Sequence, residues 1–128
     1  MEYHISKTVT GNFDEIISKV KDELKKEGFG VLTEIDIKTT LKNKLDVDFR
    51  KYTILGACNP GYAHSALLAE DKVGTMLPCN VIVQEIGEGK VEVAAVNPKA
   101  SMMAIKNTQL EQLASDVKKK LKNVVAGI

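Results

Sequence analysis

Residues 79–96, CNVIVQEIGEGKVEVAAV, decide the fold because they join two strand-like runs through a glycine turn. The run 81–83 is Val-Ile-Val, and β-branched residues of this kind favour strands. The turn at 87–89 is short and glycine-containing, which is typical of loops between antiparallel neighbours. The stretch therefore predicts a β-hairpin built from residues 79–86 and 91–96.

Two amphipathic segments flank this hairpin in the sequence. Residues 13–24 place apolar side chains on one helical face, after Asn12 as a cap and before Gly28 as a stop. Residues 108–124 repeat the pattern and predict a long C-terminal helix. Its second half carries the lysines 118–120 and 122, which we interpret as surface side chains that complement the helix dipole. A binding patch is the less favoured interpretation of these lysines.

The rest of the chain adds strands and shorter helices. Strands are predicted at 3–9, 29–36 and 52–58, and the second has apolar residues on both faces, which favours a central place in the sheet. Short helices are expected after the caps Asp36 and Asn59. We therefore predict a single α+β domain, 1–128, in which a mixed or antiparallel sheet of about five strands carries helices mainly on one face, with a single layer of each.

Composition excludes several classes of function. The chain has 18 Lys+Arg and 17 Asp+Glu, a net charge of +1, only 5% aromatic residues and no Trp, so we expect no nucleic-acid partner. No apolar run reaches the ~20 residues of a membrane span, and the first residues do not resemble a secretory signal. We expect a cytoplasmic protein with no membrane partner, whose two cysteines are free thiols.

The candidate site consists of two Cys-Asn segments, Cys58-Asn59 and Cys79-Asn80, each beside a proline. Cys58 ends a predicted strand just before a predicted helix, and helix N-termini stabilise thiolates. If the two strands are neighbours, both thiols lie at one end of the sheet. Cysteine is also among the most buried residue types, so two inert core thiols are the alternative to a reactive pair.

His64 follows one turn into the helix and offers an imidazole near Cys58 and Cys79. Two thiols and an imidazole suit Zn or Cu, but the spacing matches no standard motif and a fourth ligand is missing. No phosphate-binding glycine pattern is present, so no nucleotide cofactor is expected. No complete catalytic motif is present either, and binding is favoured over catalysis.

Three segments carry a family resemblance: GFGVLTEID at 28–36, ILGACNP at 54–60 and LPCNV at 77–81. With them the chain resembles the bacterial and archaeal family called domain of unknown function 302. The resemblance implies a compact α+β domain that associates as a homodimer and has no settled activity. The turns at Asn59-Pro60 and Leu77-Pro78 match the family pattern. The resemblance does not imply that the family requires the thiols of Cys58 and Cys79.

These observations favour a non-catalytic domain that binds a small ligand or a protein partner. Its cleft is expected at the Cys58-Asn59-Pro60 and Pro78-Cys79-Asn80 turns. The candidate ligand-binding residues are Cys58, Asn59, His64, Cys79 and Asn80. The alternative is a thiol redox or sulfur-carrier accessory protein that uses Cys58 with Cys79.

Overall fold

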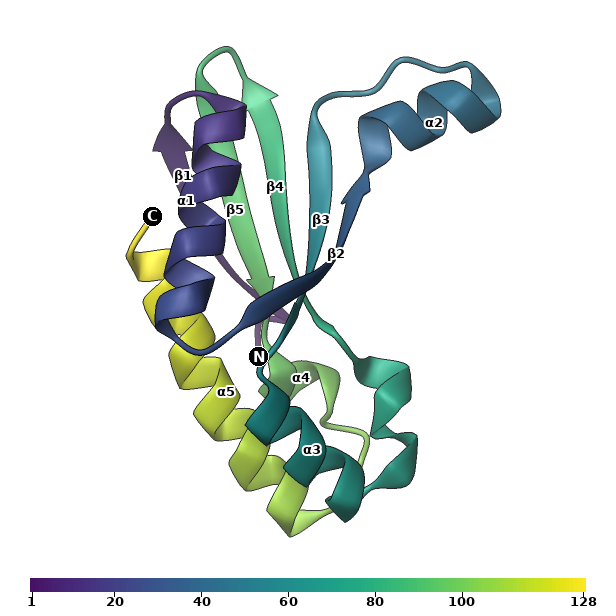
Figure 1. Cartoon of the computed structure of the whole chain (residues 1–128), viewed down its shortest axis with the longest axis vertical. Helices are drawn as coiled ribbons and strands as arrows, with labels where there is room; N and C mark the ends of the chain where they lie inside the picture. The colour runs from purple at the N-terminus through teal and green to yellow at the C-terminus, as the bar shows by residue number, and fades with distance from the viewer.

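A five-stranded antiparallel sheet forms the centre of the computed structural model, which describes residues 1–128 (Figure 1). The strand order is β1-β5-β4-β3-β2, and every neighbouring pair is antiparallel. The predicted hairpin is present as β4 and β5, paired from Val81 with Ala95 to Gly87 with Lys90. The strands are β1 (His4–Thr10), β2 (Gly30–Asp36), β3 (Tyr52–Cys58), β4 (Cys79–Gly87) and β5 (Lys90–Val96).

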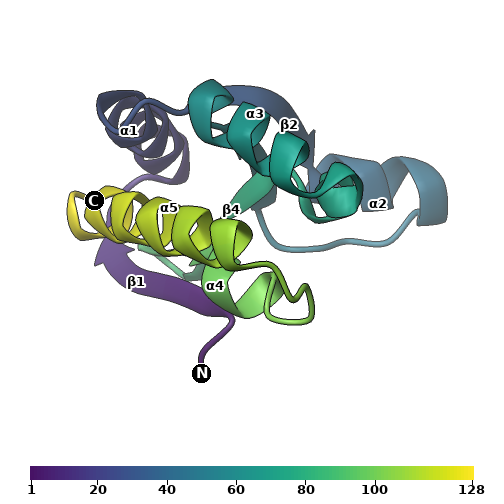
Figure 2. The same ribbon diagram turned by 90° about the horizontal axis from the view of Figure 1, so that it is seen from below.

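Helices occupy one face and one end of this sheet. Two of them, α1 and α5, cover the same face, whereas α3, α4 and a 3₁₀ helix, η1, gather beyond one end of the strands (Figures 1 and 2). None of the helices is long and apolar enough to cross a membrane. The helices are α1 (Phe13–Lys26), α2 (Ile37–Leu45), α3 (Pro60–Ala69), η1 (Asp71–Met76), α4 (Pro98–Ser101) and α5 (Thr108–Ala126). The predicted α+β class is confirmed.

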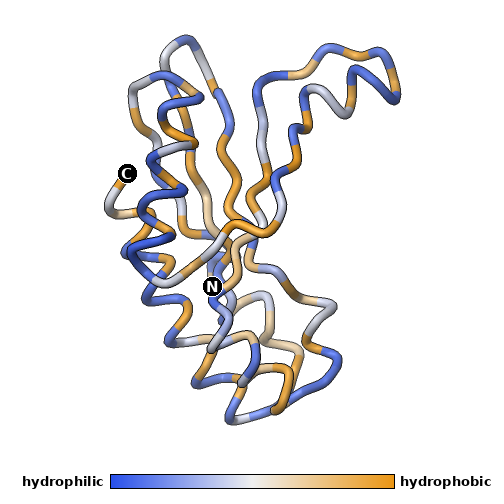
Figure 3. Tube along the Cα trace, viewed as in Figure 1, coloured by the Kyte–Doolittle hydropathy of each residue, from blue (hydrophilic) through white to orange (hydrophobic).

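The main core lies between the sheet and the α1–α5 pair. The helix α1 begins where Asn12 Oδ1 accepts a hydrogen bond from the Glu15 backbone N–H at 3.1 Å, as its sequence predicts. Its apolar face and that of α5 pack on the inward side chains of β3, β4 and β5 in a cluster of 19 buried residues. In Figure 3 hydrophobic segments follow the central strands, whereas α1 alternates between hydrophilic and hydrophobic stretches.

The prediction that β2 is a central strand is wrong. It is the edge strand beside β3, and its Leu32 and Ile35 side chains are 68% and 44% exposed. A register shift between Val31 and Thr33 interrupts its pairing, which is a common feature of sheet edges. Apolar side chains on both faces do not distinguish a covered strand from an edge strand whose apolar groups remain in water. The helix α2, which follows β2, buries no residue and projects from the body (Figure 1).

Candidate functional site

An apolar cavity of about 380 Å³ lies where the ends of β3 and β4 meet α3, η1 and α5. Nineteen residues line it, and 15 of them are hydrophobic. Four are alanines and one is glycine, so the short side chains leave space between the elements that a larger residue would fill. The lining residues are Phe29, Leu32, Ala57, Cys58, Asn59, Tyr62, Ala63, Ala66, Leu67, Gly74, Leu77, Pro78, Cys79, Pro98, Met102, Leu110, Leu113, Ala114 and Val117.

The turn at Asn59-Pro60 positions the first wall of the cavity. Pro60 stands in the first turn of α3 and Asn59 is the residue before it, as the sequence predicts. The Asn59 side chain makes no capping bond; its Nδ2 donates to the Glu27 carbonyl oxygen at 3.2 Å. This contact depends on Gly28, which has φ +84°, and whose added Cβ would lie 3.1 Å from Asn59 Nδ2. The amide thus ties the start of α3 to the α1–β2 turn.

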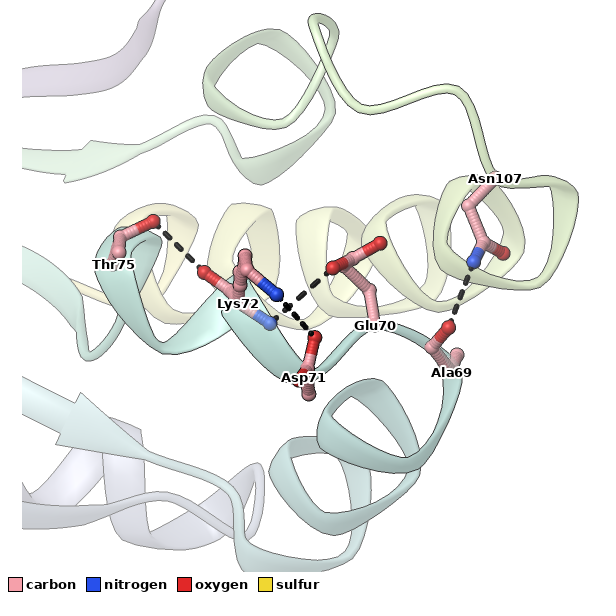
Figure 4. Close-up of polar contacts among 6 residues, drawn as sticks. All are labelled: Ala69, Glu70, Asp71, Lys72, Thr75 and Asn107. Atoms are coloured by element: carbon pink, nitrogen blue, oxygen red, sulfur yellow. Dashed lines mark hydrogen bonds and ion pairs between the residues drawn. The ribbon is translucent and has the colours of Figure 1, made fainter.

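A second asparagine, Asn107, fixes the far side of the cavity. Its Oδ1 accepts from the Leu110 backbone N–H at 3.2 Å. Its Nδ2 donates to the Ala69 carbonyl oxygen at 2.9 Å, the bond drawn in Figure 4. The first bond caps α5 and the second joins this helix to the end of α3. The two helices that enclose the cavity are therefore held at a fixed separation at this end.

The segment η1 forms the third wall. Its polar groups form local hydrogen bonds: the Lys72 backbone N–H donates to Glu70 Oε1 at 3.3 Å, and Thr75 Oγ1 donates to the Lys72 carbonyl oxygen at 2.9 Å (Figure 4). Val73 anchors the segment, because it is fully buried in a small second core of five residues. That core consists of Ala66, Val73, Met102, Leu110 and Ala114. All of them except Val73 also line the cavity, so the small core forms its floor.

The interior of the cavity carries no formal charge. No Asp, Glu, Lys, Arg or His is among the lining residues, and only two thiols and one phenol can ionise. Burial, with a smaller contribution from nearby Cys58, raises the pKa of the Cys79 thiol from its ordinary value of 9.0 to about 11. Cys79 is therefore a neutral thiol at physiological pH. An ion inside this cavity would lose its hydration without a compensating partner.

The structure brings together three of the five predicted site residues. Cys58, Asn59 and Cys79 line the cavity, and β3 and β4 are neighbours, so both thiols lie at one end of the sheet. His64 is exposed on α3 and does not line it. Asn80 is exposed and alternates with Cys79 on β4, so it faces the side of the sheet that α1 and α5 leave open.

The two thiols are neighbours without being cross-strand partners. The register pairs Cys79 with Ala57, and both cysteines are free. The segments nevertheless approach closely, because a Cβ added to Gly56 would lie 2.9 Å from Pro78 Cγ and would overlap the Thr33 hydroxyl oxygen. No three His, Cys, Asp or Glu side chains gather in an arrangement that could hold a metal ion.

Sequence reasoning missed the α5 and η1 side chains of the cavity. Leu110, Leu113, Ala114 and Val117 belong to the apolar face of the predicted C-terminal helix, and such a face alone indicates core packing rather than a cavity. The one sequence signal that could distinguish a cavity wall from a core-packing face is Ala114, a small residue on this apolar face, opposite the alanines of α3. Small residues on two facing helices indicate either close packing or a cavity, and only the fold distinguishes the two.

Comparison with known proteins identifies a family and similar solved structures. The profile of the family described as "Domain of unknown function DUF302" matches residues 5–128. A crystal structure of an uncharacterized conserved protein DUF302 from Bacillus stearothermophilus is similar, with a TM-score of 0.91 and 28% sequence identity. The similarity covers 99% of this chain and 98% of that chain. No protein with a curated description matches.

Proposed function

The chain belongs to the DUF302 family, and because that family is described without an activity, we propose a function from the cavity itself. The protein binds a small molecule whose apolar body enters the space between α3, α5 and η1. The observation that carries this proposal is an uncharged lining with 15 hydrophobic residues out of 19. The proposal favours binding over catalysis, since no Asp, Glu, Lys, Arg or His side chain lines the cavity.

The size and openness of the cavity support this function. Its volume of about 380 Å³ lies within the range of ~300–1,000 Å³ that is usual for small-molecule sites. It opens to solvent beside Leu32 and Leu67, which are 68% and 44% exposed. A ligand can enter there without displacing a core side chain. Exposed leucines at the mouth gain contacts when an apolar ligand covers them.

The test uses 1-octanol as the probe and 1,8-octanediol as its polar control, titrated calorimetrically. Octanol should bind, and the diol should bind roughly tenfold or more weakly, because its second hydroxyl would be buried without a partner. Ala63→Leu fills the cavity from α3 and should abolish octanol binding. Ser65→Leu is the matched control, since Ser65 is exposed on the same helix outside the lining. Absence of octanol binding, or equal loss in both variants, contradicts the proposal.

The alternative function, a thiol redox or sulfur-carrier protein, has one observation in its favour. Cys58 is half-buried in the cavity wall near Cys79, as a thiol pair would require. The raised pKa of Cys79 disfavours its thiolate, and the register does not pair the two residues. Labelling of Cys58 across pH 6–10 tests this alternative: a low apparent pKa would favour it, and slow labelling throughout would count against it.

Two further expectations accompany the proposed function. We propose that the protein associates as a homodimer, as the family resemblance implies. Sedimentation equilibrium at micromolar concentration tests this proposal, and a monomer at that concentration would reject it. A cytoplasmic location is proposed because both cysteines are free thiols, the ordinary state in a reducing compartment.

A further inference from the structure

A lysine stands beside the apolar cavity. Lys120 Nζ lies 5.9 Å from the centroid of the Tyr62 ring, and that ring lines the cavity. Lys120 follows Val117, another lining residue, by three positions on α5, which places both on one side of the helix. Lys120 is itself outside the lining, so its cation is next to the cavity rather than within it.

This cation has no carboxylate partner. Lys21, Lys26 and Lys42 each form an ion pair within 4 Å, with Glu34, Glu23 and Asp46 respectively, whereas Lys120 forms none. Lys120 is partly buried, unlike its neighbour Lys119, which is exposed. A partly buried, unpaired ammonium over an aromatic ring is available to a ligand anion.

We propose that the ligand is an amphipathic monocarboxylate, whose apolar chain fills the cavity and whose carboxylate pairs with Lys120. The inference rests on the proposed function and specifies its ligand class. The lining offers no charged partner, so an anionic group stays at the edge of the cavity, where water is available and Lys120 lies beside Tyr62.

The test compares octanoate with 1-octanol, which share their apolar chain and differ in charge. Calorimetric titration at low salt gives the ratio of the two affinities for the wild type, for Lys120→Met and for the matched control Lys119→Met. The ratio of octanoate to octanol affinity should fall about three- to fivefold in Lys120→Met, the size of one partly exposed ion pair. It should not change in Lys119→Met, because Lys119 is exposed.

The outcomes separate the inference from the function on which it rests. Octanol binding with an unchanged ratio in Lys120→Met, or an equal fall in both variants, overturns the carboxylate inference and leaves the apolar site standing. Failure of both probes to bind the wild type overturns the two proposals together. Added salt should reduce the wild-type ratio, since screening weakens a pair near the surface.

Discussion

Replacement of Ala66 by leucine tests whether the cavity is real space. Ala66 is 6% exposed, belongs to α3 and lines the cavity. Leucine adds three carbon groups, and burial at about 0.8 kcal/mol each contributes about 2.4 kcal/mol. Ordering the new side chain costs about 0.5–1 kcal/mol. We therefore expect Ala66→Leu to stabilise the protein by about 1.5 kcal/mol.

The assay is urea unfolding followed by circular dichroism, with Ser65→Leu as the control. The control should change the free energy of unfolding by less than about 0.5 kcal/mol, because Ser65 is exposed. Forcing a leucine into a filled core instead costs roughly 1–3 kcal/mol. The sign of the change therefore decides the question: destabilisation by Ala66→Leu would refute the reasoning that α3 and α5 enclose space.

Three other predictions concern the packing at Gly56, the buried thiol of Cys79 and the helix cap at Asp36. Gly56→Ala should destabilise the protein by roughly 1–3 kcal/mol, because the added Cβ collides with neighbouring side chains. The control Gly30→Ala should have little effect on the urea midpoint, because nothing lies within 4 Å of its added Cβ. Equal effects of the two substitutions would be inconsistent with this packing. In a Cys58→Ser variant, Cys79 should react with iodoacetamide far more slowly in the native state than in urea. The pKa of Cys79 in the folded protein, about 11, exceeds its ordinary value of 9.0. The stabilisation that the protonated thiol contributes is therefore complete below pH 9 and is lost as the pH rises toward 11. A free energy of unfolding that does not change between these two pH values would contradict the assignment. Asp36→Ala should weaken α2 by about 1 kcal/mol and speed its amide exchange without moving the global midpoint, since the helix buries nothing. Hydrogen bonds from Thr39 lower the pKa of Asp36 below its ordinary value of 3.8, so protonation should remove this cap from wild-type α2 as the pH falls below 3.8. Amide exchange in α2 that is unchanged by Asp36→Ala, or unchanged by the fall in pH, would contradict a role for the cap.

The sequence predicts most of the fold because its local signals agree with one another. Asn12 and Gly28 bound α1, and the glycine turn at 87–89 makes β4 and β5 antiparallel neighbours, as the structure has them. The position of β2 could not be predicted in the same way. Strand order depends on contacts between distant segments, and apolar residues on both faces are equally compatible with an edge strand.

The candidate site was predictable in location and less so in composition. Cys58, Asn59 and Cys79 are at the predicted turns and line the cavity, because strand ends and a proline-started helix are local features. The walls from η1 and α5 come from distant parts of the chain, so no spacing rule reveals them. Asn59 illustrates the limit: its capping position follows from the sequence, but its bond to Glu27 exists only in the folded chain.

The central claim is that the space between α3, α5 and η1 receives the apolar body of a ligand. Intermolecular nuclear Overhauser effects between 1-octanol and methyl-labelled protein test it most directly. The account predicts contacts from the octanol chain to the methyl groups of Ala66, Leu110 and Ala114, which line the cavity. Contacts confined to the exposed methyl groups of Leu68 and Met103, or none at any octanol concentration, would contradict it.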